Sequence, residues 1–290
     1  MDTRELTAPP SFPALYARSV LSRPSRRLDF PRTRVVLRDQ RFDSGRLTEF
    51  CRLTGFPVRD EVPLPFPQVV AFGLQVDLMV REPFPFSVVG VLHVQQEFEQ
   101  TRALHAGERF DLSVRAVGML PHRRGATVEL RTELTVAGER APVWTGRSSY
   151  LARGVDWPGI PRDAARLDAP AGEGTVWRVP ADLGRRYGAV SGDVNPVHVS
   201  PLTARAFGFR RAIAHGMWTA SRALADLGGP ALGAARYEVD FGSPLYLPST
   251  VRHVARREAD GWSSAVRSRD GEKVHLATRL RREVTAPRGR

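Results

Sequence analysis

The sequence contains very little cysteine, almost no lysine and no long hydrophobic run. Cys51 is the only cysteine among 290 residues, so the chain can form neither an internal disulfide nor a thiolate metal site. A single thiol is typical of a reducing compartment, and we expect a cytoplasmic location. No stretch approaches the roughly 18 uninterrupted apolar residues of a membrane helix, and the first thirty residues lack the apolar region of a signal peptide. These absences predict a soluble protein without membrane insertion.

The positive charge comes almost entirely from arginine. Lys273 is the only lysine, although Lys and Arg together number 43 against 31 Asp and Glu, which gives a net charge of +12. The arginines are spread over the whole chain among acidic residues, and no helix-turn-helix, zinc-finger or RNP-type motif accompanies them. We therefore expect no nucleic-acid binding. Single arginines can still bind an anionic small molecule, because a guanidinium grips phosphate with two hydrogen bonds.

Composition along the chain predicts two halves and a linker. Residues 153–174 are rich in Pro and Gly, which interrupt helices and strands, and we place the linker there. Residues 1–30 and 282–290 are rich in Pro and Arg without periodicity, so they are expected to be loosely held ends. The two folded halves are then residues 31–152 and 175–281.

Each half is predicted to contain one long helix followed by strands, which is an α+β plan. In the second half, the Ala-rich run 215–227 forms this helix, after shorter helices at 181–190 and 201–207. The strands expected after it are 236–241, 251–258, 262–269 and 273–280. In the first half, helices are expected at 44–53 and 66–80, and strands at 33–37, 88–97, 110–117, 126–136 and 142–151.

The halves also correspond in sequence. The triplet Ala71-Phe72-Gly73 matches Ala214-His215-Gly216, and Phe98 matches Phe241 with the same separation. A constant separation supports a duplicated domain.

The densest group of polar residues lies between Tyr187 and His198. Asp193 and His198 are five residues apart in a segment in which Pro196 fixes its own φ and pushes Asn195 toward extended geometry. A rigid loop can hold a carboxylate and an imidazole on one water molecule, as acid–base chemistry on water requires. The alternative interpretation is an ordinary polar loop.

This segment resembles the signature of a known family. The run Ser191-Gly-Asp-Val-Asn-Pro-Val-His198, followed by Ala206-Phe-Gly-Phe209 and Ile213-Ala-His-Gly-Met217, is similar to that of the MaoC-like dehydratases, the (R)-specific enoyl-CoA hydratase 2 group. The resemblance implies a double hotdog fold, in which each unit is a long helix wrapped by an antiparallel sheet and one unit can be degenerate. It also implies reversible hydration of trans-2-enoyl thioesters to (3R)-3-hydroxyacyl thioesters, without a cofactor.

The resemblance also implies roles for matching residues. Asp193 and His198 would hold and activate the catalytic water, with Asn195 helping to orient them. Gly216, at the start of the long helix, would donate its N–H to the thioester carbonyl. Physical chemistry favours this last role independently, because a helix N-terminus has unsatisfied N–H groups and a partial positive charge.

The residues expected to bind substrate lie beside this group. They are Ser191, Gly192, His215, Arg210 and Arg211. We favour His215 as a residue that positions the loop. The two arginines could reach the phosphates of coenzyme A, although solvated surface arginines explain them equally well.

The first half lacks the chemical groups of the second. Aligning Gly55 with Gly192 places Phe56 where Asp193 stands, and Phe72 replaces His215. The first half is therefore expected to keep the fold without the chemistry. Its apolar helix, which starts near Phe66, either lines an acyl-chain tunnel or fills a core.

Two other functions remain open. A thioesterase can use the same scaffold, because a fold does not determine a function. A non-catalytic acyl-thioester-binding subunit is the other alternative, although such a subunit has no need of the Asp193 and His198 pair. In either case the partner is an acyl-CoA or acyl-carrier-protein thioester, and a homodimer of double-hotdog chains is expected. No metal site is expected, because the remaining histidines have no ligand partners at metal-binding spacing; they are His93, His105, His122, His253 and His275.

Overall fold

The chain forms two compact units that are interleaved in sequence. The computed structural model describes residues 2–12, 14–15, 18, 30–88, 90–161, 165–228 and 233–282. Unit 1 comprises Met1–Arg41, Pro67–Gln96 and Glu108–Ala165, and unit 2 comprises Phe42–Phe66, Glu97–Gly107 and Arg166–Arg290. The division after Ala165 falls inside the expected linker.

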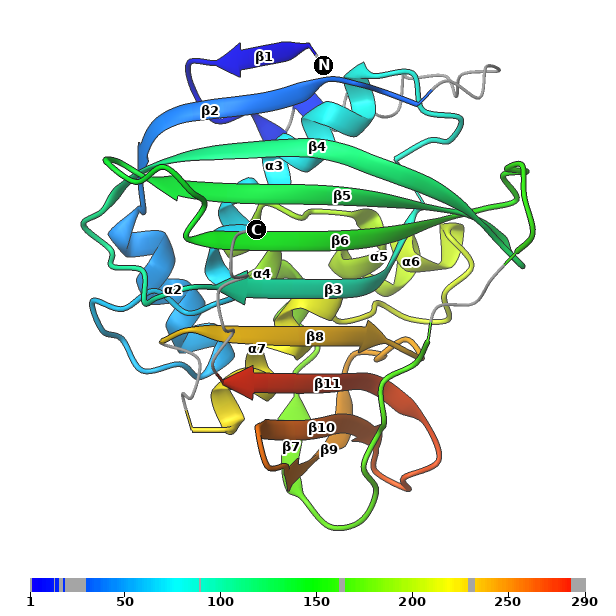
Figure 1. The fold of residues 1–290 in the computed structure, drawn as a ribbon. Helices are drawn as coiled ribbons and strands as arrows, with labels where there is room; N and C mark the ends of the chain where they lie inside the picture. Colours follow the sequence, from blue (N-terminus) through cyan, green and yellow to red (C-terminus); the bar gives the residue numbers. More distant parts are fainter. Residues whose placement is uncertain are drawn as a thin grey trace. The chain divides into compact units, whose positions relative to one another are not determined.

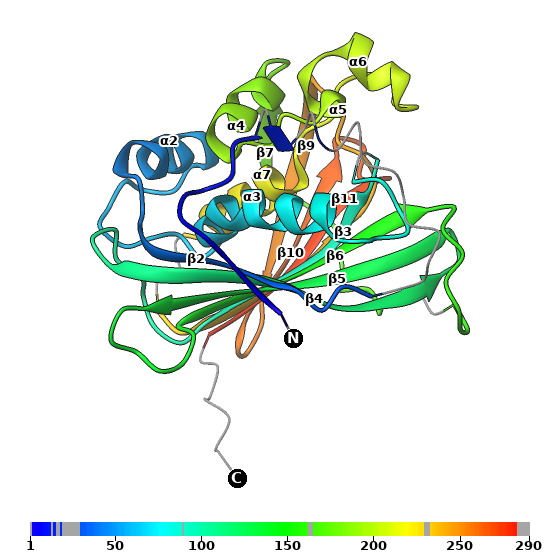
Figure 2. The same ribbon diagram turned by 90° about the horizontal axis from the view of Figure 1, so that it is seen from above.

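Unit 1 is a sheet with one long helix on its face (Figures 1 and 2). The helix α3 (Phe66–Arg81) is joined to this sheet by Gln75, whose Nε2 donates to Thr132 Oγ1 at 3.0 Å and to Ser148 Oγ at 3.2 Å. The strands, in spatial order, are β1 (Thr3–Leu6), β2 (Arg34–Arg41), β4 (Arg109–His122), β5 (Gly125–Val136) and β6 (Trp144–Arg153). Another strand, β3 (Leu92–Gln100), has residues in both units.

Alternating residues explain why the sheet of unit 1 has one buried face. Along β5, every second side chain from Ala126 to Val136 is buried, which is the period of two that a strand imposes. On α3, Leu74 and Leu78 are completely buried, and Val76 and Val80 pack against Leu15. These helix residues fill a core.

The N-terminal segment differs from the expectation of a loosely held end. Thr3–Leu6 pairs in parallel with β2, and Phe12 stacks on Phe72 at 6.1 Å between ring centroids. Arg4 Nη2 lies 2.6 Å from Oδ2 of Asp77, whose side chain is only 2% exposed. A buried carboxylate needs such a partner, and this requirement fixes the segment. The rest of the expected loose ends, residues 1, 13, 16–17, 19–29 and 283–290, lies outside the described residues.

Unit 2 contains further strands with a helix packed on them. Its strands, in spatial order, are β8 (Ala235–Phe241), β11 (Val274–Arg282), β10 (Gly261–Ser268), β9 (Ser249–Arg257) and β7 (Thr175–Val179). The helix α7 (Gly216–Asp226) contacts β10 and β11, and Tyr237 of β8 donates its hydroxyl hydrogen to the carbonyl of Ala220 at 2.9 Å. The predicted α+β class is confirmed.

Four further helices lie among the described residues of unit 2. They are α2 (Ser44–Thr54), α4 (Leu183–Ser191), α5 (Pro196–Val199) and α6 (Pro201–Ala206). Both α2 and α4 end at a left-handed glycine, Gly55 with φ 87° and Gly192 with φ 78°, a conformation that favours glycine. This shared ending agrees with the alignment of these two glycines.

The helix α2 belongs to unit 2 although its sequence lies in the first half. Trp218 Nε1 of α7 donates to the carbonyl of Leu53 at 3.0 Å, and α2 also contacts α4. The predicted stretch 31–152 is therefore not one compact unit, because Phe42–Phe66 clusters with the residues that follow the linker.

Among the described residues, no helix is long and apolar enough to cross a membrane.

The buried ion pair of Asp77 predicts an unequal effect of two arginines that hold β1. Arg4→Met leaves the buried carboxylate with Arg81 as its one ion-pair partner among the described residues, and we expect the free energy of unfolding to fall by about 2–3 kcal/mol. Arg38→Met removes ion pairs with Glu5 and Asp111 in which every side chain is at least 40% exposed, so the expected loss is clearly smaller, because water screens exposed pairs. Urea denaturation followed by circular dichroism measures both, and equal losses would contradict the assignment.

Candidate active site

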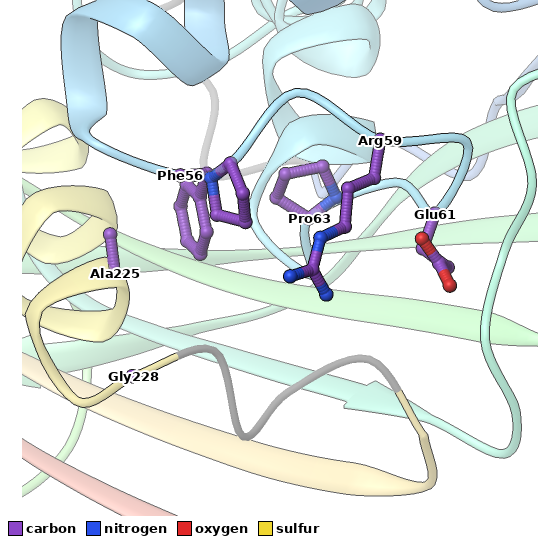
Figure 3. Close-up of a pocket in the computed structure, with 7 residues that line it drawn as sticks. Phe56, Arg59, Glu61, Pro63, Ala225 and Gly228 are labelled. Carbon is purple, nitrogen blue, oxygen red and sulfur yellow. The ribbon is translucent and has the colours of Figure 1, made fainter.

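A cavity of about 270 Å³ opens in unit 2 near the C-terminal end of α7 (Figure 3). Its walls are Phe56, Pro57, Arg59, Glu61, Pro63, Ala225 and Gly228. Among the described residues, these walls carry one guanidinium and one carboxylate but no imidazole. Phe56 also stands where the alignment of the two helix endings places Asp193. The cavity therefore lacks the pair of groups that acid–base chemistry on water needs.

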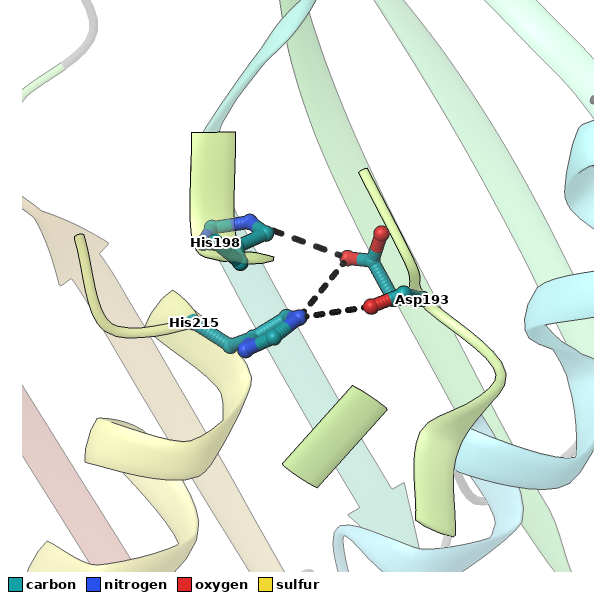
Figure 4. A group of neighbouring side chains, drawn as sticks. All are labelled: Asp193, His198 and His215. Carbon is teal, nitrogen blue, oxygen red and sulfur yellow. Dashed lines mark hydrogen bonds and ion pairs between the residues drawn. The ribbon is translucent and has the colours of Figure 1, made fainter. Parts of the chain in front are cut away.

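Three titratable side chains meet at the other end of α7 (Figure 4). Asp193 lies in the loop after α4, His198 lies in α5, and His215 directly precedes α7. His198 Nε2 is 4.0 Å from Asp193 Oδ2, and His215 Nε2 is 3.8 Å from the same oxygen. The structure thus brings together the carboxylate and imidazole that the sequence singled out.

The end of α4 determines the position of Asp193. The N–H of Gly192 donates to the carbonyl of Gly188 at 2.8 Å, which closes the helix. The N–H of Asp193 then donates to Ser191 Oγ at 3.1 Å, and Asp193 Oδ1 accepts the N–H of Asn195 at 3.2 Å. Both the backbone and the carboxylate of Asp193 are held. These contacts of Ser191 and Gly192 serve Asp193, and substrate binding by either residue remains a prediction.

The short helix α5 determines the position and the tautomer of His198. Asn195 Oδ1 accepts the N–H of Val197 at 3.3 Å and caps this helix, with Pro196 at its first position. His198 Nδ1 lies 2.8 Å from the carbonyl oxygen of Ile213. A carbonyl only accepts, so Nδ1 carries the proton, and Nε2 of the neutral ring has a lone pair on the side of Asp193. Asn195 therefore orients both side chains. Its backbone N–H holds Asp193, and its side chain caps the helix that carries His198.

His215 is a buried hydrogen-bond donor. Its side chain is 2% exposed, and Nε2 donates to the carbonyl oxygen of Asp193 at 2.8 Å. Its ring stacks on His198 with 3.7 Å between centroids. Burial, with a smaller contribution from His198, lowers the pKa of His215 to about 3. Because Nδ1 has no hydrogen-bond partner among the described residues, a second proton there would be poorly solvated. His215 therefore stays neutral and holds the loop.

The three side chains suit a metal ion poorly. One ligand atom from each lies within 4.8 Å of the others. However, His215 Nε2 carries the proton that it donates to Asp193, so this nitrogen has no lone pair for a metal. Two ligand atoms remain, fewer than the three protein ligands usual in catalytic zinc sites.

The start of α7 presents backbone N–H groups beside this cluster. The helix begins at Gly216, directly after His215, and its first N–H groups have no intrahelical partner. A Cβ atom on Gly216 would lie 2.8 Å from the Phe241 ring. Only glycine therefore fits this close packing of the helix start on β8.

Arg210 and Arg211 lie outside the three-residue cluster. Both are exposed, and their guanidinium carbons lie 5.6 and 5.8 Å from the centroid of the Tyr246 ring. They are close in sequence to Ile213, whose carbonyl holds His198. Phosphate binding by these arginines remains a prediction.

Sequence reasoning missed Arg46. This side chain of α2 donates from Nε to the carbonyl of Val190 at 2.6 Å and from Nη2 to that of Ser191 at 3.1 Å. It lies 144 residues before Val190, in the half expected to lack chemistry. No local motif distinguishes it from the many other arginines.

Comparison with known proteins gives a consistent result. The family model for the MaoC like domain matches residues 171–278, the region that contains the cluster. The chain is 31% identical over 257 residues to a protein of Mycobacterium tuberculosis named 3-hydroxyacyl-thioester dehydratase X, and this match covers 87% of this chain and 90% of the relative.

Solved structures agree with the sequence comparison. The crystal structure of HtdX from Mycobacterium tuberculosis matches with a TM-score of 0.75 and 29% identity, over 86% of this chain and 100% of that chain. A protein of the same organism described as having a double hotdog fold matches with a TM-score of 0.52 and 15% identity, over 90% and 96% of the two chains. The predicted double hotdog fold is confirmed, and the chain belongs to the family of MaoC-like dehydratases.

Proposed function

We propose that this protein catalyses the reversible hydration of trans-2-enoyl thioesters to (3R)-3-hydroxyacyl thioesters. The observation that carries the proposal is the 4.0 Å separation of Asp193 Oδ2 and His198 Nε2, both held by backbone contacts. The name of the Mycobacterium tuberculosis relative, a 3-hydroxyacyl-thioester dehydratase, supports the same reaction class.

The separation of the two groups fits one bridging water. A water molecule about 2.8 Å from each atom would see the nitrogen and the oxygen at an angle of about 90°, close to its own bond angle. It would donate one hydrogen to His198 Nε2 and the other to Asp193. Its lone pairs then point away from both residues, toward the β-carbon of a bound enoyl thioester.

Hydration adds the hydroxyl group of water to the β-carbon and a proton to the α-carbon. An O–H bond of the water breaks, the oxygen bonds to the β-carbon, and the π electrons move through the α-carbon onto the thioester oxygen. The N–H of Gly216 stabilises this enolate, an effect worth roughly 3 kcal/mol for a fixed donor. One of Asp193 and His198 takes the proton of the broken O–H bond, and the other, protonated at the start, delivers its own proton to the α-carbon. A proton that passes from the first group to the second restores both for the next turnover, and His215 takes no part because it stays neutral.

The proposal also covers the substrate carrier, the cellular location and the oligomeric state. Arg210 and Arg211 are suited to the phosphates of an acyl-CoA or acyl-carrier-protein thioester. A cytoplasmic location agrees with Cys51, whose thiol has its pKa raised to about 11 by burial and stays protonated. We also propose a homodimer of double-hotdog chains, which light scattering of the purified protein tests.

Replacing either member of the proposed water-holding pair is expected to abolish turnover without unfolding the protein. Asp193→Asn and His198→Gln should each lower kcat/KM by at least about a hundredfold, because each removes a proton-transfer group. The measurement is the loss of enone absorbance with trans-2-enoyl-CoA esters of short, medium and long chain.

Matched controls separate chemistry from general damage. Asp182→Asn and His105→Gln make the same side-chain changes outside the cluster and should keep the wild-type rate. A near-full rate in either cluster variant would refute the role of that residue. Release of free thiol without loss of the enone by hydration would instead identify a thioesterase.

The proposed role of Arg210 and Arg211 predicts a dependence on the substrate carrier. In the double variant Arg210→Gln/Arg211→Gln, KM for an enoyl-CoA should rise at least about tenfold, because charge-assisted bonds to phosphate are lost. The N-acetylcysteamine thioester of the same acyl group has no phosphate, so its kcat/KM should not change. Equal effects on both substrates would argue against phosphate binding.

The low pKa of His215 predicts lower stability in acid. The pKa falls from 6.5 to about 3 on folding. As pH drops below 6.5, the unfolded chain therefore gains a proton that the native protein does not, and stability falls by about 1.4 kcal/mol per pH unit. When the pH is lowered from about 7 to about 4.5, the free energy of unfolding of His215→Asn should fall by about 2–3 kcal/mol less than that of the wild type. Urea denaturation at the two pH values measures this difference. Equal losses would show that His215 is not held neutral.

A further inference from the structure

We propose that Arg46 is a positioning residue of the active site. It lies in α2, and it holds the C-terminal end of α4 and thereby the loop that carries Asp193. The inference rests on the proposed hydratase function. It means that a segment from the half without counterparts of Asp193 and His215 is needed for full turnover.

The contacts of Arg46 are made to the last carbonyls of α4. Nε donates to Val190 at 2.6 Å and Nη2 donates to Ser191 at 3.1 Å. Carbonyls in the last turn of a helix have no intrahelical partner, and a cation there is favoured by the helix dipole. The planar guanidinium has N–H groups on separate nitrogens and can donate to both carbonyls at once. The compact ammonium group of a lysine could not do so equally well.

The position of Arg46 is itself fixed. Its backbone N–H donates to Oδ1 of Asp43, the N-cap of α2, at 2.6 Å. Burial lowers the pKa of Arg46, so this cation has lost much of its hydration. Hydrogen bonds to protein groups must replace the hydrogen bonds to water that burial removed. Arg52, in the same helix, has a side chain 66% exposed, and its ion-pair partner among the described residues is Glu49, one turn away.

A short connection leads from Arg46 to the proposed water site. Ser191, whose carbonyl accepts from Arg46, also accepts the N–H of Asp193 through its hydroxyl. Movement at Ser191 would therefore shift Asp193 both through the chain and through this hydrogen bond. Because a water molecule must bridge the 4.0 Å between Asp193 and His198, a displacement of about 1 Å would disrupt the reacting geometry.

The first test compares turnover in three variants. In Arg46→Ala, kcat should fall about tenfold or more while KM changes less than about twofold, because a positioning residue acts on the reacting geometry and not on substrate binding. Arg46→Lys should recover part of the rate. Guanidinium ion at low millimolar concentration should also restore part of the Arg46→Ala rate. Arg52→Ala, the matched control, should keep the wild-type kcat.

The second test does not depend on turnover. Amide hydrogen exchange, measured by NMR, should become faster at Asp193, Val194 and Asn195 in Arg46→Ala, whereas amides of α7 should keep their rates. A wild-type protein inactive on all enoyl thioesters would refute the proposed function, and exchange would then decide the role of Arg46 alone. Wild-type kcat and unchanged exchange in Arg46→Ala would overturn the inference.

Discussion

The hydrogen bond from His215 Nε2 to the carbonyl of Asp193 is the interaction on which the site depends. It ties the N-terminus of α7 to the loop after α4, and these two elements are 22 residues apart in sequence. Through it, the N–H groups that begin α7, the carboxylate of Asp193 and the ring of His198 share one location. The donor has to be neutral histidine, because a charged ring in so buried a place would be poorly solvated. Burial thus gives His215 a fixed structural role, as the donor that joins the two elements.

Much of this arrangement could be predicted from the sequence because it is local. Asp193, Asn195, Pro196 and His198 lie in one segment, and the dihedral restriction of proline and the capping side chain of asparagine act over only a few residues. The long helices and most strands also followed from hydrophobic periodicity, which is set by neighbours along the chain.

What the sequence did not reveal depends on distant contacts. The two bonds of Arg46 join residues 144 and 145 positions apart, and nothing near Arg46 marks it among so many arginines. The pairing of β1 was missed because its four residues carry no strong pattern, and the buried partner of Arg4 lies 73 positions away. The interleaving of the two units was missed for the same reason, since composition shows where a linker lies but not which helices pack together.

The two left-handed helix endings differ in the residue that follows the glycine. Gly55 and Gly192 give the chain the same turn, and the next residue is Phe56 in one case and Asp193 in the other. Phe56 stacks on Phe50 with 6.2 Å between ring centroids and is buried among apolar groups, whereas Asp193 accepts a backbone N–H and faces two imidazoles. An apolar side chain such as Phe56 needs no contact with water, so the end of α2 can be part of the core. This helix still contributes Arg46 to the second ending, and this contact provides a physical reason for the two segments to pack in the same unit.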